Sequence, residues 1–300
     1  MPRQAYVNGR FVRHDEAGVH IEDRGYQFAD GVYEVWAVFN GKLADSDGHF
    51  QRLRRSLGEL GIAEPMGRPA LELVLKEAVR RNCVKTGLVY LQVTRGVAPR
   101  DHAFPTRPTK PGLVITARSI DWNAAQARAA TGVAVITTPE TRWARCDIKS
   151  VSLLPNVLAK QAAREAGAAE AWFVDDLGLV TEGASSNAWI VDQDGTVRTR
   201  DLNANILRGV TRHSLLDLMA SEGLQVSERP FSLEDAKAAR EAFITGAGTL
   251  VMPVVKIDGA KIGDGRPGPV ATRLRDLYLR HASADAPERS QRLQPAQLGP

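Results

Sequence analysis

The chain has 300 residues, of which 43% are hydrophobic and 25% charged, and its formal net charge is +4 at pH 7. This composition is ordinary for a globular protein with one large or two medium domains. The basic residues are spread along the chain, without the basic stripe typical of nucleic-acid binding, so nucleic acid is not expected as a partner. A membrane is not expected either, because no apolar run approaches the ~20 residues of a spanning helix and the N-terminus lacks a signal-peptide core.

Turn signals divide the first part of the chain. Asn8-Gly9 and Asn40-Gly41 are turn dipeptides between apolar runs, which predicts hairpins over 5–12 and 33–43. The segment 95–111 contains four prolines and is predicted to be a long loop, of the kind that is often functional. The remaining elements predicted here are helices over 49–60 and 70–82 and strands over 88–94 and 112–117.

A polar, alanine-rich segment, 122–130, is predicted to link an N-terminal domain over 1–121 to a C-terminal domain over 131–282. The end of the chain, 283–300, is polar and rich in Pro and Gln, which predicts a disordered tail. Hairpins outnumber regular βαβ units, so the predicted fold class is α+β with mixed, largely antiparallel sheets. In the second half we expect helices over 155–166, 233–239 and after Thr211, and strands over 132–138, 171–175, 179–182, 188–191, 242–246 and 254–257.

The two cysteines, Cys83 and Cys146, lie in apolar surroundings and lack a Cys-x-x-Cys spacing. We expect buried free thiols, with a structural disulfide as the alternative. Free thiols are typical of a reducing compartment, so the sequence predicts a cytoplasmic protein. No metal site is predicted.

A lysine and a later carboxylate suggest the chemistry. Lys149 lies in a mostly apolar, strand-like setting, with Asp147 as a possible charge partner, and Glu182 closes a later strand before the small-residue run 183–187. Pyridoxal phosphate (PLP) needs such a pair, because a lysine holds its aldehyde as a Schiff base and an acid pairs with its pyridinium nitrogen. The alternatives are a surface lysine on an edge strand and an ordinary turn glutamate.

Two loops could hold a phosphate. Gly209 followed by Thr211 resembles a glycine turn before a helix N-terminus, where free N–H groups bind anions. The segment 245–249 is a second Gly/Thr loop at a strand end. Ordinary helix capping explains either loop about as well, and neither has the spacing of a Walker or dinucleotide motif.

Five ordered blocks carry a family resemblance that extends from about Tyr6 to Tyr278. The chain resembles the fold-type IV PLP-dependent enzymes, the class of branched-chain and D-amino-acid aminotransferases, and within it most closely the D-amino-acid aminotransferases. The resemblance implies a smaller N-terminal α/β domain and a larger C-terminal domain that binds the cofactor. The matching blocks are 22–35, 92–96, 145–150, 158–161 and 181–187.

The resemblance implies a role for single cofactor-binding positions. Lys149 matches the lysine that forms the Schiff base, and Glu182 matches the acid that meets the pyridine nitrogen. Arg52 matches the family's phosphate-binding arginine, and Val210 and Thr211 match its phosphate-binding helix start.

The family's second phosphate loop corresponds to Ala247 and Gly248. The family usually carries an extra hydroxyl where this chain has Ala247. Either Thr249 compensates or the loop binds by its backbone alone, and the sequence leaves both open.

The loop 95–111 bears on the substrate. In D-amino-acid aminotransferases a Pro-Arg-x-His segment of this loop, with a tyrosine, holds the substrate α-carboxylate, and the matching residues are Arg100, His102 and Tyr33. An arginine recognises a carboxylate through two hydrogen bonds. The alternative for Arg100 and His102 is ordinary loop polarity. In the family this loop reaches into the neighbouring subunit, which implies a homodimer.

The implied activity is a ping-pong transamination from a D-amino acid, such as D-alanine or D-glutamate, to a 2-oxo acid. Three rivals share the fold: branched-chain L-amino-acid aminotransferase, (R)-amine transaminase and aminodeoxychorismate lyase. A non-catalytic small-ligand-binding protein is a rival of another class. The preferred substrate and the biological role stay open at this point.

Overall fold

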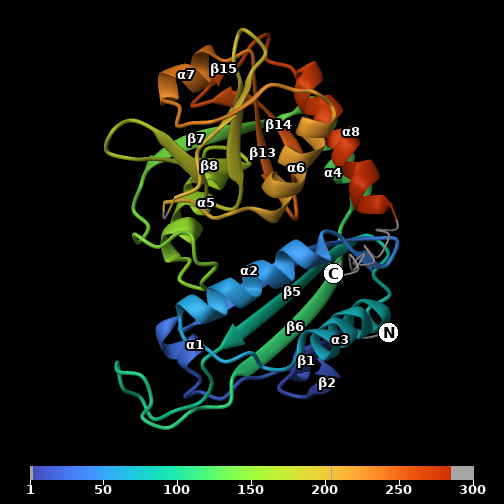
Figure 1. Ribbon diagram of the computed structural model, residues 1–300, viewed down its shortest axis with the longest axis vertical. Coiled ribbons are helices and arrows are strands. Elements are labelled where there is room, and N and C mark those ends of the chain that lie inside the picture. Colours follow the sequence, from blue (N-terminus) through green and yellow to red (C-terminus); the bar gives the residue numbers. More distant parts are fainter. Residues whose placement is uncertain (1–2, 204, 285–300) are drawn as a thin grey trace, which may run out of the picture.

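The computed structural model describes residues 3–203 and 205–284. Figure 1 shows two bodies, one above the other, each built on its own sheet, with helix α2 running along their junction. The lower sheet has six strands in the order β2-β1-β6-β5-β3-β4, and its neighbours all pair antiparallel. Its strands are β1 (Gln4–Val7), β2 (Arg10–Arg13), β3 (Gly31–Phe39), β4 (Lys42–Leu43), β5 (Gly87–Thr94) and β6 (Gly112–Ser119).

The upper sheet has nine strands, with the order β12-β11-β10-β13-β14-β7-β8-β9 and with β15 paired to β14. It is mixed: β7 is parallel to β14 and β8, and β11 is parallel to β12, whereas the other pairs are antiparallel. Its strands are β7 (Val133–Pro139), β8 (Glu170–Val174), β9 (Val180–Gly183), β10 (Asn187–Val191), β11 (Val197–Thr199), β12 (Val226–Glu228), β13 (Glu241–Gly246), β14 (Leu250–Ile257) and β15 (Ala260–Lys261).

Helices accompany both sheets. Helices α2 and α3 contact strands of the lower sheet, and α6 and α8 pack on each other and against the upper sheet. The helices are α1 (Arg24–Phe28), α2 (Ser46–Glu59), α3 (Arg68–Arg81), α4 (Trp122–Thr131), α5 (Leu154–Glu165), α6 (Val210–Ser221), α7 (Leu233–Ala238) and α8 (Pro269–Ser283), with a short 3-10 helix at His14–Glu16. The predicted α+β class with mixed, largely antiparallel sheets is confirmed.

Asn-Gly turns form both predicted hairpins. Asn8 and Gly9 have φ of 49° and 108°, and Asn40 and Gly41 have φ of 51° and 76°. Two consecutive positive φ angles match the right-handed twist of the strands in a two-residue hairpin, and Asn and Gly tolerate them best. These turns pair β1 with β2 and β3 with β4 in the lower sheet.

Strand β3 separates the core from the site. Val32 and Trp36 are fully buried in the core that α2 and α3 share with the lower sheet. Tyr33 and Val35 alternate with them and line a cavity between the two bodies. Because successive side chains of a strand point to opposite faces, one face of β3 packs in the core and the other faces the site.

The structure differs from the sequence-based expectations in three places. The segment 122–130, predicted to be an interdomain linker, is helical and belongs to α4, and Trp122 packs edge-on against Phe39 with ring centroids 5.5 Å apart; its role as a linker stays a prediction. Helix α8 was not predicted, although Pro269 at its start and the buried Leu274 and Tyr278 have helical spacing. Cys83 is exposed rather than buried; both cysteines are free, as predicted, and Cys146 is buried.

Other expectations concern the limits of the chain. The domain boundaries 1–121 and 131–282 stay a prediction, and the predicted tail 283–300 lies outside the described residues except for its first two. Among the helices of the described ranges, none is long and apolar enough to cross a membrane. The same ranges contain no group of three or more metal-ligating side chains.

Candidate active site

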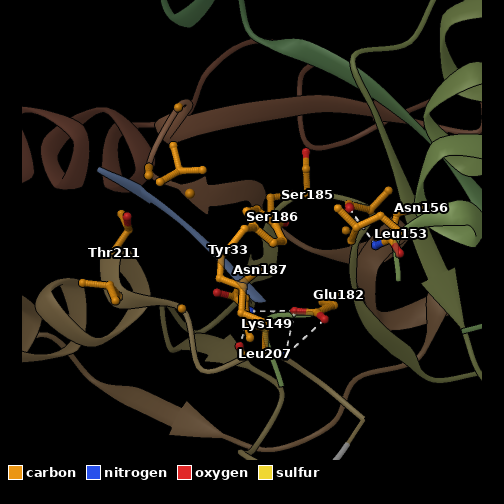
Figure 2. Close-up of a pocket in the computed structure, with 18 of the residues that line it drawn as sticks. Tyr33, Lys149, Leu153, Asn156, Glu182, Ser185, Ser186, Asn187, Leu207 and Thr211 are labelled. Atoms are coloured by element: carbon orange, nitrogen blue, oxygen red, sulfur yellow. Dashed lines mark hydrogen bonds between the residues drawn. The ribbon is translucent and has the colours of Figure 1, made fainter. Parts of the chain in front are cut away.

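A cavity of about 400 Å³ lies between the two bodies. It is lined by β3, by α2, by the segment before α5, by the turn between β9 and β10, by the start of α6 and by the turn between β13 and β14. Figure 2 shows Tyr33, Lys149, Glu182 and Asn187 gathered together, with Thr211 at some distance on the other side. Residues far apart in the sequence therefore share one site.

Lys149 is held against β3 by its backbone. Its carbonyl accepts a hydrogen bond from Tyr33 N at 3.0 Å, and its own N–H donates to Ser56 Oγ at 3.2 Å. The Lys149 Nζ lies 4.2 Å from the centroid of the Tyr33 ring. The predicted strand-like setting is wrong, because the segment is a loop that meets β3 through one isolated bridge, between Ser150 and Val32.

Asp147 is not the charge partner of Lys149. Its carboxylate accepts hydrogen bonds from Arg145 Nε at 2.9 Å and from the Arg55 guanidinium. These contacts fasten the loop before Lys149 to helix α2. The lysine amine is left facing the cavity rather than an acid on its own loop.

Glu182 is a buried carboxylate surrounded by donors. Its oxygens accept hydrogen bonds from Arg142 Nη1 at 2.5 Å, from Asn187 Nδ2 at 3.0 Å and from Leu207 N at 3.1 Å. Burial raises the pKa of Glu182 above its usual value, and the Arg142 guanidinium opposes that shift. Because all these contacts are donors, they fit the ionised, acceptor-only carboxylate.

The opposite end of the cavity is a helix N-terminus. Helix α6 begins at Val210 after Gly209, and no side chain in the described structure caps it. Its first N–H groups therefore stay available to an anion, which the helix dipole also favours. Val210 and Thr211 both line the cavity.

Arg52 approaches this end from helix α2. Its Nη1 donates to the carbonyl of Arg208 at 3.0 Å, while Nε and Nη2 donate to Glu34 at 2.7 and 2.8 Å. Burial alone would raise the pKa of Glu34, but Arg52 and His49 lower it to about 2. Glu34 is therefore an anion that fixes the guanidinium of Arg52 beside the start of α6.

The turn between β13 and β14 carries Ala247 and Gly248 to the cavity. Thr249 follows them, and its Oγ1 is buried without a hydrogen-bond partner in the described residues. A Cβ on Gly246 would lie 3.3 Å from this oxygen, so the hydroxyl occupies space that a side chain at Gly246 would need. An unpaired buried hydroxyl at this place favours a polar ligand.

Together these residues fit PLP. The cavity offers an amine at Lys149, an anion at Glu182 for a ring nitrogen, and an arginine, a helix N-terminus and a free hydroxyl for a phosphate. All of the sequence-predicted cofactor residues line it: Arg52, Lys149, Glu182, Val210, Thr211, Ala247 and Gly248.

Arg100 and His102 lie outside the cavity lining, on the exposed loop after β5, whereas Tyr33 lines it. The loop is fastened by Arg24, whose Nη1 donates to the carbonyl of Asp101 at 2.6 Å. Arg100 and His102 lie 5.2 and 5.4 Å from the ring of Phe28. One chain by itself therefore does not assemble the predicted carboxylate-binding trio.

Sequence reasoning missed two residues that hold the site together. Arg142 lies just upstream of the block that contains Lys149, and Glu34 lies inside the block of Tyr33, but neither received a role. A charged residue at a core-facing position of a strand is a usable signal, because such residues are rarely buried unless paired. Glu34, next to Tyr33 in β3, shows that signal.

Comparison with known proteins decides the family. The sequence model described as amino-transferase class IV matches residues 31–257. The chain belongs to the class IV aminotransferase family. The D-alanine aminotransferase of Bacillus licheniformis is 42% identical over 268 residues, which cover 89% of this chain and 93% of that protein. The D-alanine aminotransferase of Listeria innocua is 39% identical over 91% of this chain and 94% of that protein.

Solved aminotransferase structures share the fold. A branched-chain amino acid aminotransferase from T.th., solved with pyridoxamine 5'-phosphate, has a TM-score of 0.84 at 27% identity, covering 96% of each chain. The Escherichia coli branched-chain enzyme has a TM-score of 0.86 at 22% identity, covering 97% of this chain and 98% of that one. The predicted resemblance to fold-type IV aminotransferases is confirmed.

Proposed function

We propose that this protein is a PLP-dependent aminotransferase that transfers the amino group of a D-amino acid to a 2-oxo acid. The observation that carries the proposal is the placement of Lys149 and Glu182 on one cavity, with the α6 N-terminus at its other end. The preference for D-amino acids is supported by the D-alanine aminotransferases, which are about 40% identical over nearly the whole chain.

When bound, PLP supplies an electron sink that makes the proton on the substrate α-carbon removable. Lys149 is the residue that takes this proton and returns it, because its amine faces the cavity against the Tyr33 ring. The rest of the cavity keeps the reacting atoms in place. Arg52, with the α6 N-terminus, would hold the phosphate, and Glu182 would hold the ring nitrogen.

The substrate α-carboxylate requires a cation, and Arg100, the residue expected to supply it, lies outside the cavity, which Arg118 of the same chain lines. Arg100 and His102 are exposed in the single chain and free to face a neighbouring copy. We therefore propose a homodimer in which the loop 95–111 of one copy completes the site of the other. The two free cysteines fit a reducing compartment, and a cytoplasmic location is part of the same proposal.

A steady-state assay separates the candidates. The purified protein with PLP is supplied with 2-oxoglutarate and with D-alanine, L-alanine, L-leucine or (R)-1-phenylethylamine as donor, and the new oxo compound is measured. We expect turnover with D-alanine at least about 100-fold above turnover with L-alanine or L-leucine, because only a donor of the D configuration aligns its α-proton with Lys149. A preference for L-leucine or for the amine would assign the protein to a rival activity of the same fold.

A further inference from the structure

One block of the family resemblance, residues 158–161, received no role. It lies on helix α5, and its Lys160 reaches the first residue of β8, Glu170. The Lys160 Nζ lies 3.3 Å from Glu170 Oε1 and donates to the carbonyl of Ala169 at 2.6 Å. Lys160 is 41% exposed at its side chain, whereas that of Glu170 is 1% exposed. The pair therefore connects a solvent-facing helix to a buried carboxylate.

The other oxygen of Glu170 binds the turn between β9 and β10. Glu170 Oε2 accepts hydrogen bonds from Ser185 Oγ at 2.7 Å, from Ser185 N at 3.2 Å and from Ser186 Oγ at 3.0 Å. Both serines line the active-site cavity, and Figure 2 shows them between Tyr33 and helix α5. A single buried carboxylate thus fixes both serine side chains.

Helix α5 holds the same turn at a second point. One turn before Lys160, Asn156 Nδ2 donates to the carbonyl of Ala184 at 2.9 Å. No side chain fits at Gly183 in this turn, because a Cβ there would lie 2.3 Å from Ser186 Oγ and 3.1 Å from Glu170 Cγ. The strands that flank the turn carry Glu182 and Asn187, so its position is coupled to the acid end of the site.

The hydrogen bonds also fix the polarity of the two serines. A hydroxyl has one proton, and Ser185 and Ser186 each donate theirs to Glu170. What remains for the cavity is the lone pairs of the two oxygens, which accept hydrogen bonds from a ligand N–H or O–H. By accepting both hydroxyl protons, Glu170 therefore makes this wall of the cavity an acceptor surface.

We propose that Lys160 and Glu170 are positioning residues for the transamination site. They fix the 183–186 turn and hold Ser185 and Ser186 as acceptors toward the cofactor and the amino group of the substrate. This inference rests on the proposed function. Glu170 and Lys160 also border a second cavity of about 200 Å³. Glu170 therefore connects Lys160, at the second cavity, to the two serines that line the active-site cavity.

The test compares Lys160→Met with a matched control. Lys237→Met removes an ion pair of the same 3.3 Å length, with Asp258, from a lysine that is 37% exposed and does not line either cavity. Glu170→Gln and Lys160→Arg complete the set. For each holoenzyme, the circular dichroism of the bound cofactor, the dissociation constant of PLP, kcat and KM are measured. Thermal unfolding is followed in parallel.

We expect Lys160→Met to change the cofactor circular dichroism and to weaken PLP binding about threefold, with Lys160→Arg restoring both. Glu170→Gln should weaken PLP binding more than about tenfold, because it replaces charge-assisted hydrogen bonds to both serines. Lys237→Met should leave the cofactor spectrum and kcat unchanged.

Two results would overturn the inference. One is a Lys160→Met holoenzyme with the cofactor spectrum, PLP affinity and kcat of the parent protein. The other is an equal change in the cofactor spectrum and in PLP affinity for Lys160→Met and Lys237→Met. That result would show that losing either ion pair only lowers the stability of the protein in general. If Glu170→Gln does not fold, Lys160→Met with its arginine rescue decides the matter alone. A parent protein that binds no PLP would instead refute the proposed function.

Discussion

Arg142 Nη1 lies 2.5 Å from Glu182 Oε1, and both side chains are only 6% exposed. The same guanidinium donates from Nε and Nη2 to Glu140. A buried arginine with two acids stays charged, so it stabilises Glu182 as an anion at the end of the cavity where we propose that the ring nitrogen binds.

Removing this arginine should therefore cost both stability and cofactor affinity. Arg142→Met leaves the buried carboxylate of Glu182 and the partly buried one of Glu140 without their arginine, and we expect a loss of about 3 kcal/mol in the free energy of unfolding, measured by urea denaturation. Arg273→Met is the control, because its ion pair with Glu222 is exposed and should contribute less than about 1 kcal/mol. Equal losses in the two variants would contradict the role given to Arg142.

Buried pairs of an arginine and a carboxylate that lie far apart in the chain are what the sequence does not predict. The hairpins at Asn8-Gly9 and Asn40-Gly41 and most helices follow from neighbouring residues, so local patterns predicted them well. Arg142 and Glu182 are 40 residues apart in the chain, and Arg52 and Glu34 are 18 apart. Which acid meets which arginine depends on how strands and helices pack, and no local spacing encodes it.

The family resemblance singled out Lys149, Glu182 and Arg52, and the structure brings these three residues to one cavity. Their roles toward the cofactor stay a prediction. The setting of Lys149 was misjudged, since apolar neighbours such as Ile148 are buried by tertiary packing rather than by a strand. Helix α4 was not predicted as a helix, because its alanine-rich sequence has few apolar residues to show a period.

The buried anion Glu34 predicts a pH dependence of stability. Its pKa falls from an ordinary value of 4.5 to about 2 in the folded protein. A depressed carboxyl pKa stabilises the fold above the unfolded-state value, and the contribution is lost as the pH falls through the folded-state value. The shift corresponds to about 3 kcal/mol.

Glu34→Gln should remove this dependence. Urea unfolding of the parent protein and the variant is compared at about pH 6 and about pH 3, on either side of the ordinary pKa of 4.5. We expect the parent protein to be more stable than Glu34→Gln at the higher pH. This difference in the free energy of unfolding between the two proteins should narrow at the lower pH. A difference that stays constant, or widens as the pH falls, would show that Glu34 is not held as an anion by Arg52.

The unpaired hydroxyl of Thr249 predicts a contribution to phosphate binding. Thr249→Val keeps the shape of the side chain and removes the hydroxyl, so we expect PLP to bind about tenfold more weakly. Thr249→Ser keeps the hydroxyl and is the matched control. Titration with pyridoxal, which lacks the phosphate, distinguishes the cause: its affinity should be equal in the parent protein and both variants. An equal loss for pyridoxal would mean that Thr249 acts on the ring or on folding.

The loop with Arg100 and His102 predicts complementation between subunits. Arg100→Ala and Lys149→Ala should each abolish activity with D-alanine. In a mixed dimer, the loop of the Lys149→Ala chain completes the site of the Arg100→Ala chain. Random mixing of two inactive variants in a symmetric dimer should therefore restore about a quarter of the parental activity.

The control for this experiment is Arg107→Ala, an exposed arginine in the same loop. It should retain the KM of the parent protein for D-alanine, because it is not part of the proposed carboxylate site. If mixing restores no activity although mixed dimers form, Arg100 serves the site of its own chain or no site at all.

The most direct test of the account is a single turnover without an acceptor. The PLP-loaded protein is mixed with D-alanine or with L-leucine, and the visible absorption band of the bound cofactor is followed together with the appearance of pyruvate. The account predicts that D-alanine removes the band and releases one pyruvate per site, whereas L-leucine leaves the band in place. Lys149→Ala, which cannot form the Schiff base, should lack this band and release no pyruvate. Loss of the band with L-leucine but not with D-alanine would contradict it.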